Sequence, residues 1–385
     1  ACKDVEVIGW LYQYYISERK AEVFAGFEKR KKAGAREIPA ATQLFTPHWI
    51  VQYLLDNSLG RLWMLNKPNS RLIEKMEYYI KPEEEETDFL RITKPEEIKI
   101  CDPACGSGHM LTYAFDLLYA IYEEEGYDPA QIPILILENN LYGIEIDRRA
   151  ADLAAFALMM KARKKSRSFL NKGIQPNIKL LENIDIDAGQ LKQYIDHVGN
   201  DLFTPDVRVT IDQFKDADLF GSLIVPELKD PRPVLEEIKA LKIDDELFYR
   251  EVHDNIIKTL EQAEYLSQKY HVVVANPPYM GSRNMEKKLS DWIKDHYSDV
   301  KSDLFSSFIV RNTWLALPKG QLGFMSPYVW MFISSYEKLR NFLIDTKTIT
   351  SLVQLEYSGF DGATVPICTF TLENHHRAGH EGAFI

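Results

Sequence analysis

The sequence predicts an α/β fold: a seven-stranded, mostly parallel sheet with helices on both faces, plus an N-terminal helical region and a helical insertion. Short apolar runs rich in β-branched residues, such as 271–275, are typical of buried parallel strands. These runs alternate with longer segments of helical periodicity, such as 109–125 and 148–161, and this alternation indicates a parallel sheet. With 385 residues, of which 45% are hydrophobic, the chain can bury a large core.

The composition argues against several classes of protein. A net charge of −11 argues against a stand-alone nucleic-acid groove binder, so a nucleic-acid substrate would require a basic face that is local or belongs to another part of the protein. No run approaches the roughly 18 apolar residues of a membrane span, and the N-terminus lacks a signal-peptide pattern. The cysteines, Cys2, Cys101, Cys105 and Cys368, show no Cys-x-x-Cys spacing, which favours a reduced compartment, the cytoplasm. Cys101 and Cys105 are expected to be packing residues, and no metal site is expected.

The N-terminal region is predicted to be helical. Apolar residues recur at helical spacing through 4–30, and the basic stretch 29–32 is interpreted as a solvated helix end, with DNA contact as the less favoured alternative. Thr46 and Pro47 then predict a second helix start, with Thr46 as the N-cap and Pro47 at the first helical position. The Thr46 hydroxyl and the first N–H groups of that helix would form an anion site suited to a carboxylate.

The clearest local signal is a glycine-rich turn after the predicted strand 98–101. The turn reads Asp102-Pro103-Ala104-Cys105-Gly106-Ser107-Gly108 and leads into a helix. Its glycines permit positive φ and close approach of a ligand at the carboxyl end of a strand, where open α/β sheets bind ligands. We expect Asp102, Ala104, Gly106 and Gly108 to line this pocket. Because an acid before the glycines disfavours pyrophosphate and the G-x-G-x-x-G pattern is absent, a cationic ligand with an adenosine-like body, S-adenosylmethionine, fits better than NAD.

The next two predicted strands also end in polar residues. Glu145 lies at the end of the second strand, where an acid can accept hydrogen bonds from both hydroxyls of a ribose, and Asp147 is the alternative for that role. The third strand ends near Asn183 and Asp185, and either could bond the amino group of an adenine ring. We prefer Asn183 because it comes first after the apolar run.

The motif Asn276-Pro277-Pro278-Tyr279 directly follows the strand 271–275. Two successive prolines remove two backbone donors and fix φ, so the turn is stiff and offers acceptors without competing N–H groups. An asparagine amide, a rigid carbonyl and an aromatic face suit a planar amine that is held by its N–H groups. Hydrogen bonds to the Asn276 side-chain oxygen and the Pro277 carbonyl would activate such an amine, while Tyr279 would stack on a flipped base.

Three stretches interrupt this pattern. Residues 67–97, with four glutamates at 83–86, are predicted to form an exposed insertion with a solvated charge run. Residues 188–268 contain a proline-rich break and then a helical pattern over 236–269, which predicts a helical insertion at one edge of the core. The stretch 281–288, with glycine and three basic residues, is interpreted as a mobile basic lid next to the site.

The order of the Thr-Pro helix start, Asp-Pro-Ala-Cys-Gly-Ser-Gly, Gly-Ile-Glu-Ile-Asp and Asn-Pro-Pro-Tyr resembles the DNA methyltransferases that make N6-methyladenine. The stretches 8–16, 40–49 and 59–66 look most like the adenine-specific methyltransferases called PglX, from BREX phage-defence systems. The resemblance implies a Rossmann-like class I methyltransferase fold. It also implies methyl transfer from S-adenosylmethionine to the N6 amino group of a flipped adenine in double-stranded DNA, in phage defence or restriction-modification.

The same resemblance implies roles for the site residues. Thr46 would meet the methionine carboxylate of the cofactor and Asp102 its amino group. Glu145 would hold the ribose and Asn183 the adenine of the cofactor. Asn276, Pro277 and Tyr279 would hold the target base, with Pro278 completing the catalytic motif.

The resemblance also organises the chain into five parts. These are an N-terminal helical region with the Thr-Pro motif (1–66), the exposed insertion (67–97), a cofactor-binding half (98–187), the helical insertion (188–268) and a catalytic half (269–385). Members of the family carry a separate target-recognition domain further along, so we expect a catalytic-region fragment. Its expected partners are DNA, that recognition domain and other defence-system proteins, but no membrane.

Two other functions compete with DNA methylation. Asn-Pro-Pro-Tyr also occurs in methyltransferases that act on a protein glutamine or on RNA guanine, although the upstream Thr46-Pro47 start and the large size disfavour them. The chain could alternatively serve as a cofactor-binding scaffold or sensor subunit in a defence complex, without methylation by this fragment. The net negative charge of the chain and the missing recognition domain are compatible with that hypothesis.

Overall fold

The computed structural model describes residues 6–44, 46–241, 247–356 and 365–385. It divides into two compact units, one made of residues up to 178 together with 269–385 and the other of 179–268. The second unit contains the whole stretch that the sequence indicated as a helical insertion. Within the described ranges, no helix has the length and apolar character needed to cross a membrane.

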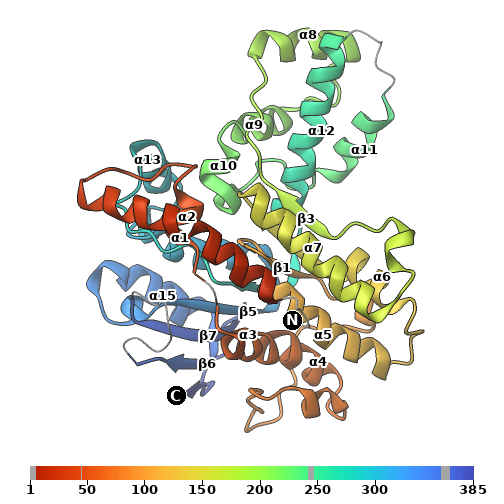
Figure 1. The fold of residues 1–385 in the computed structure, drawn as a ribbon, viewed down its shortest axis with the longest axis vertical. Helices are drawn as coiled ribbons and strands as arrows, with labels where there is room; N and C mark the ends of the chain where they lie inside the picture. Colours follow the sequence, from red (N-terminus) through yellow and green to blue (C-terminus); the bar gives the residue numbers. More distant parts are fainter. Residues whose placement is uncertain (1–5, 45, 242–246, 357–364) are drawn as a thin grey trace. The chain divides into compact units, whose positions relative to one another are not determined.

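An eight-stranded sheet with the order β3-β2-β1-β4-β5-β7-β6-β8 organises the first unit (Figure 1). Its strands are β1 (Ile100–Asp102), β2 (Leu141–Glu145), β3 (Asn177–Leu180), β4 (Tyr270–Ala275), β5 (Ala316–Pro327), β6 (Thr348–Gln354), β7 (Ile367–Glu373) and β8 (Ala383–Phe384). Strands β2, β1, β4 and β5 are parallel neighbours, whereas β7 is antiparallel to β5 and β6. The predicted count of seven is one short, because β8 has only two residues, too few to leave a period-two pattern.

The chain leaves the middle of this sheet in two directions. From β1 it passes to β2 and β3 on one side, and it returns as β4 on the other side of β1, followed by β5. The register pairs Asp102 with Gly143 and Cys101 with Val273, so the carboxyl ends of β2, β1 and β4 share one edge. Ligands of open α/β sheets bind at this edge where the strand order changes direction. The fold therefore sets the glycine-rich turn after β1 beside the Asn-Pro-Pro-Tyr motif after β4.

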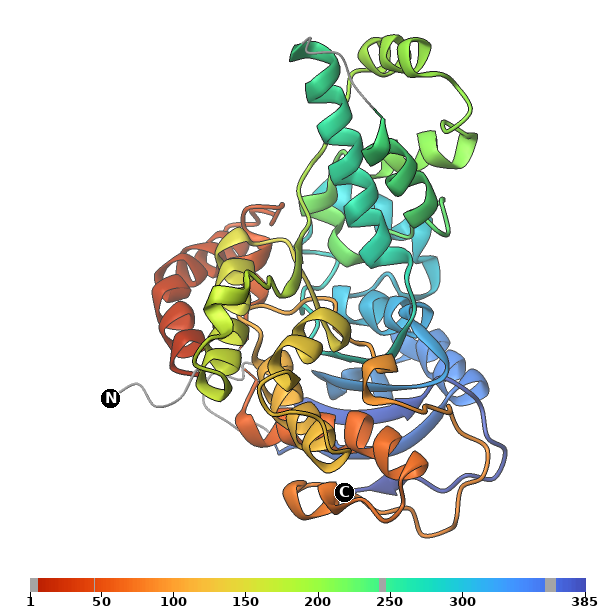
Figure 2. The ribbon, with the colours of Figure 1, turned by 90° about the vertical axis from the view of Figure 1, so that its right-hand side faces the viewer.

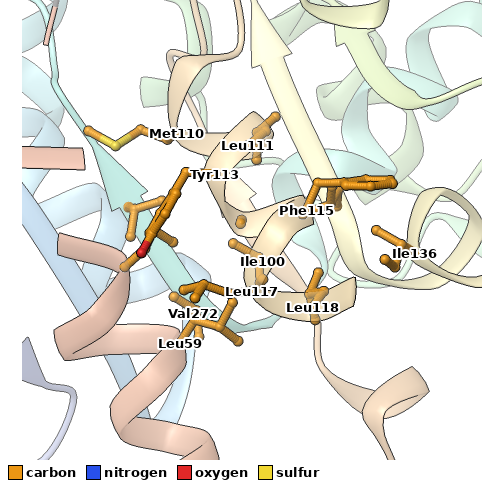
Figure 3. Packing of buried hydrophobic residues seen from close by; sticks show 14 of the residues in the cluster. Leu59, Ile100, Met110, Leu111, Tyr113, Phe115, Leu117, Leu118, Ile136 and Val272 are labelled. Carbon is orange, nitrogen blue, oxygen red and sulfur yellow. The ribbon is translucent and has the colours of Figure 1, made fainter. Parts of the chain in front are cut away.

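Helices surround the sheet of the first unit (Figures 1 and 2). They are α1 (Glu6–Glu28), α2 (Ile38–Thr42), α3 (His48–Leu55), α4 (Arg61–Asn66), α5 (His109–Glu124), α6 (Ile132–Leu135), α7 (Arg148–Lys165), α13 (Lys287–His296), α14 (Leu304–Leu315) and α15 (Glu337–Thr346). Buried side chains of α5 pack with Ile100 of β1 and Val272 of β4 (Figure 3). Val273 is also fully buried and points to the other face, because successive strand residues alternate. Burial on both faces explains why β4 is apolar from Val272 to Ala275.

Helix α1 lies beside α7 (Figure 2). Tyr12 of α1 is buried against Ala150, and its hydroxyl donates a 2.9 Å hydrogen bond to Oδ2 of Asp147. Tyr15 also belongs to the apolar pattern that predicted a helix over residues 4–30, but it is exposed. The bond from Tyr12 fastens the N-terminal region to the end of β2.

The predicted exposed insertion, 67–97, is only partly exposed. Leu72 packs in the main core, and Glu86 is buried between Arg61 and Arg377, with 8% of its side chain exposed. Burial acts to raise the pKa of Glu86, but the charges of the two arginines outweigh it and hold that pKa below its ordinary value. The prediction of a solvated charge run is wrong for this glutamate, because one of its partners lies 291 residues away and leaves no local signal.

The second unit is helical and has its own core. Its helices are α8 (Ala188–Val198), α9 (Pro205–Gln213), α10 (Ala217–Phe220), α11 (Arg232–Ala240) and α12 (Leu247–Ser267). The core includes Tyr194, whose hydroxyl lies 2.7 Å from Nδ1 of His253. The single helical pattern expected over 236–269 corresponds to α11 and α12, and residues 242–246 between them lie outside the described residues.

Candidate active site

The glycine-rich turn connects β1 to α5. Gly106 and Gly108 have φ of 52° and 84°, values that L side chains rarely adopt. A Cβ at Gly108 would lie 3.0 Å from the Cβ of Ala154, so this glycine lets the turn pack against α7. A Cβ at Gly106 would meet nothing within 4 Å. Gly106 is therefore the position where the turn faces open space.

Two acids stand at this turn, Asp102, which is buried, and Glu145, which is partly buried. Asp102 is 2% exposed, and burial raises its pKa to about 8, although a 3.1 Å hydrogen bond from the Ala104 N–H opposes the shift. Burial also raises the pKa of Glu145, against the hydrogen bonds that it accepts from backbone N–H groups. Neither acid forms a salt bridge with any described residue. A buried and a partly buried acid without a cationic partner favour a cationic ligand.

The geometry favours Glu145 over Asp147 as the residue that faces the turn. Oε2 of Glu145 accepts a 2.8 Å hydrogen bond from the Gly106 N–H, while Oε1 accepts from the next two backbone N–H groups at 2.8 and 2.9 Å. Asp147 instead caps α7 through two backbone N–H groups and accepts the hydroxyl of Tyr12. The carboxylate of Glu145 thus lies against the turn, whereas that of Asp147 is directed to α7 and α1.

The side chain of Asn276, directly after β4, is held by the segment that precedes α3. Its Nδ2 donates to the Leu44 carbonyl at 2.9 Å and to Oγ1 of Thr46 at 3.1 Å, a residue 230 positions away in the sequence. Both amide hydrogens are used in this way. The side-chain oxygen is therefore the group of Asn276 that is oriented for another donor.

Thr46 does not cap a helix, and this part of the sequence prediction is wrong. Helix α3 begins at His48, and Pro47 occupies the cap position without a side-chain hydrogen bond. The hydroxyl of Thr46 accepts from Asn276 instead, and Thr46 is 6% exposed. The Thr-Pro segment is consequently part of the same hydrogen-bonded group as the Asn-Pro-Pro-Tyr motif.

Tyr279 completes this group. Its hydroxyl lies 2.6 Å from Oδ1 of Asn276 and 3.0 Å from the Met325 carbonyl of β5, and its single proton can serve one acceptor fully at a time. Burial raises the pKa of Tyr279 well above its ordinary value, so the hydroxyl stays a neutral donor. The ring meets Phe305 edge to face, with centroids 6.2 Å apart.

Asp303 is a residue of this site that the sequence analysis did not single out. Its Oδ1 accepts from the Met280 N–H at 2.9 Å and from the Phe305 N–H at 3.3 Å, so it caps α14 and also fastens the residue after Tyr279. Further along the same stretch, Met285 forms a β-bridge with Ala33. The stretch interpreted as a mobile lid is thus bonded on two sides. An aspartate before a helix signals a cap, but nothing local signals the bond to Met280.

The sequence matches the Eco57I restriction-modification methylase family over residues 139–360 and the DNA-methyltransferase domain of MmeI over residues 83–190. The chain belongs to the Eco57I restriction-modification methylase family. It is 39% identical to the adenine-specific methyltransferase BrxX of Escherichia coli O9:H4 and 33% identical to the adenine-specific methyltransferase PglX of Lacticaseibacillus casei, each over 99% of this chain. The predicted resemblance to adenine-specific methyltransferases is confirmed. The chain spans about a third of the length of these relatives, 34% and 33%.

Two solved structures share the fold of this methylase. A nuclease-deletion mutant of the Type ISP enzyme LlaGI, in complex with a DNA substrate mimic, matches 90% of the chain and 24% of its own length, with a TM-score of 0.52 and 14% identity. The DrdV–DNA complex matches 94% of the chain and 29% of its own length, with a TM-score of 0.51 and 14% identity. Together with the family membership, these matches confirm the predicted methyltransferase fold.

Most of the predicted site residues of the methylase lie in the first unit, around the two motifs. They are Thr46, Asp102, Ala104, Gly106, Gly108, Glu145, Asn276, Pro277, Pro278 and Tyr279. Asn183 belongs to the second unit, where its side-chain oxygen accepts a 2.9 Å hydrogen bond from the Asp218 N–H. Cys101 and Cys105 are buried free thiols. Among the described residues, no three or more histidine, cysteine or acidic side chains form a group that could hold a metal ion.

Proposed function

We propose that the full-length protein transfers a methyl group from S-adenosylmethionine to the N6 amino group of a flipped adenine in DNA, in phage defence or restriction-modification. The observation that carries this proposal is the anchoring of the Asn276 amide, whose two N–H groups are bound to Leu44 and Thr46. The amide oxygen is thereby oriented as an acceptor, which is bonded to the Tyr279 hydroxyl in the structure and would complement one N–H donor of an adenine amino group. The names of the curated relatives, both adenine-specific methyltransferases, support the same assignment.

The first unit offers groups that fit S-adenosylmethionine. The buried Asp102 would bind the methionine amino group, Glu145 would accept the ribose hydroxyls, and the open space at Gly106 admits a ligand against the backbone. The hydroxyl of Thr46 accepts from Asn276 and keeps its own proton for the methionine carboxylate. When bound, S-adenosylmethionine supplies an electrophilic methyl group.

The residues after β4 would activate the amine. The lone pair of an adenine amino nitrogen is delocalised into the ring, and hydrogen bonds to Asn276 Oδ1 and the Pro277 carbonyl would localise it and stabilise the developing positive charge. When the amine donates to Asn276, the Tyr279 hydroxyl can donate to the Met325 carbonyl instead, which lies 3.0 Å away. The Tyr279 ring would stack on the flipped base, which is worth about 1–3 kcal/mol.

The partners are proposed for the full-length protein. They are double-stranded DNA with an adenine target, a target-recognition domain outside this chain and other proteins of the defence system, all in the cytoplasm. The DNA-bound state of the structural neighbours LlaGI and DrdV supports the DNA assignment.

Incubation of the full-length protein with methyl-labelled S-adenosylmethionine and duplex DNA tests the proposed reaction. After digestion of the DNA to nucleosides, the label is expected in N6-methyladenine. Label in another nucleoside, or in protein glutamine or RNA guanine with the DNA unlabelled, would reject the assignment of the target.

Cofactor binding is expected to depend on pH through Asp102. A carboxyl group with its pKa raised to about 8 is mostly protonated at pH 6, and the methionine amino group binds the ionised form. Affinity should therefore rise by up to about tenfold per pH unit from pH 6 to about 8, with release of a proton on binding. Calorimetry with S-adenosylhomocysteine, which keeps the amino group, measures both effects. Asp102→Asn should bind more weakly and without this pH dependence, and an unaltered profile in that variant would remove Asp102 from the role.

Substitution of Tyr279 separates the hydroxyl from the ring. Tyr279→Phe loses the bond to Asn276, but the Asn276 amide keeps its two other hydrogen bonds, so turnover should fall by no more than about tenfold, the net value of one hydrogen bond. Tyr279→Ala also loses the stacking face and should weaken capture of the flipped base by about 1–3 kcal/mol more. Steady-state kinetics on duplex DNA compares the two variants, and equal losses would show that the ring has no stacking role.

A further inference from the structure

Two basic stretches that lie far apart in the sequence meet in the first unit. Residues 29–32 follow α1, and residues 283–288 follow the Asn-Pro-Pro-Tyr motif. Ala33 joins them, because its N–H donates to the Asn284 carbonyl at 2.8 Å and its carbonyl accepts from the Glu286 N–H at 3.0 Å. The ammonium group of Lys32 also donates to the Arg283 carbonyl. Figure 1 shows the end of α1 near α13, which begins at Lys287.

The basic side chains at this junction are exposed. We call them the basic surface, and they are Lys29, Arg30, Lys31, Lys32, Arg283, Lys287 and Lys288. Lys29, Lys31 and Arg283 form no salt bridge with any residue that the structure describes. Positive charge is thus concentrated locally in a chain whose net charge is −11.

The basic surface is close to the catalytic motif. Arg283 follows Tyr279 by four residues, so their Cα atoms lie within about 14 Å of each other, the reach of four extended residues. A base flipped onto Tyr279 stays attached to its strand, so the phosphates that flank it must lie near the motif. Phosphate oxygens are the natural partners of exposed lysine and arginine side chains.

We infer that the basic surface binds the phosphate backbone of DNA beside the flipped nucleotide. The inference rests on the proposed function only in taking DNA as the substrate, and it assigns the chain a sequence-independent contact of its own, apart from any recognition domain. This contact would hold the strand in place while the base is out of the stack. It also replaces the interpretation of residues 29–32 as merely a solvated helix end.

The test is the salt dependence of DNA binding by the full-length protein. The variant carries Lys31→Gln, Arg283→Gln and Lys287→Gln together, and Lys32 is left in place because its ammonium group bonds the Arg283 carbonyl. Binding of a fluorescent 30-base-pair duplex of mixed sequence is measured between 50 and 200 mM KCl. The slope of log K against log salt is negative, and each lost phosphate contact reduces its magnitude by about 0.9, so the magnitude should fall by about 2.7. The loss should be similar for unrelated duplex sequences.

The matched control changes two exposed basic residues elsewhere in the first unit, Lys164→Gln and Arg167→Gln, at the end of α7. It should keep the slope of the unmodified protein. An unchanged slope in the triple variant, or an equal fall in the control, would overturn the inference. If the basic surface binds an acidic protein and not DNA, the slope of the triple variant should be unchanged.

A second measurement does not depend on the folding of the variant. Saturating duplex should protect Lys29 and Lys31 of the unmodified protein from acetylation, and full reactivity of both lysines in the complex would equally overturn the inference. Failure of the proposed function is distinguishable. If the slope falls as expected but labelled DNA contains no N6-methyladenine, the reaction is wrongly assigned and the surface stands. If adenine is methylated and the slope is unchanged, the surface is wrong and the reaction stands.

Discussion

Replacement of Asn276 by alanine is expected to reduce adenine methylation by the full-length protein by about 10²–10³-fold. The Asn276 oxygen would accept a hydrogen bond that strengthens as the amino nitrogen becomes positive, and loss of one such preorganised group commonly costs that much in turnover. Affinity for S-adenosylmethionine should change little, because Asp102 and Glu145 lie on other strands. Single-turnover kinetics on duplex DNA, with calorimetry for the cofactor, separates these two quantities.

An exposed asparagine outside the site, Asn171, serves as the matched control. Asn171→Ala should leave both turnover and cofactor affinity unchanged. A normal methylation rate in Asn276→Ala would mean that another group holds the target amine. A parallel loss of cofactor affinity would mean that the substitution disturbs the Thr46 segment, which binds the Asn276 amide, rather than the chemical step.

Glu86→Ala is expected to destabilise the protein by about 3–5 kcal/mol. The substitution leaves Arg61, whose side chain is only 6% exposed, without its carboxylate partner, whereas Arg377 keeps its ion pair with Glu373. Breaking a buried ion pair by removing one partner leaves an uncompensated charge in the interior, which accounts for the large cost. The shift of the denaturant midpoint at unchanged slope measures the loss of stability.

Glu84, in the same run of glutamates but exposed, is the matched control for Glu86, and Glu84→Ala should change stability by less than about 0.5 kcal/mol. The pH dependence has a defined sign. Because the pKa of folded Glu86 is lowered, its contribution is present at neutral pH and is lost as the pH falls through that lowered value. Glu86→Ala should therefore flatten the acid side of the stability profile. Equal stability of the two variants would show that the network contributes nothing.

The sequence by itself determined seven of the eight strands, the main helices and the motifs at the strand ends. Strand β4 was predictable because a parallel strand buried on both faces must be apolar throughout, and the glycines at 106 and 108 because few other residues tolerate their positive φ. These constraints are local, because they act on residues that are consecutive in the sequence. The likeness of the motifs to known adenine-specific methyltransferases was readable for the same reason.

Only the tertiary structure decided which distant groups meet. Thr46 looked like a helix cap, but its hydroxyl binds Asn276, and Glu86 looked solvated, but it lies between two arginines. The junction of residues 29–32 with 283–288 through Ala33 is of the same kind. Each outcome depends on the path of the whole chain, because a hydroxyl or a carboxylate forms hydrogen bonds with whichever partner the fold brings near. The residues next to it in the sequence do not identify that partner.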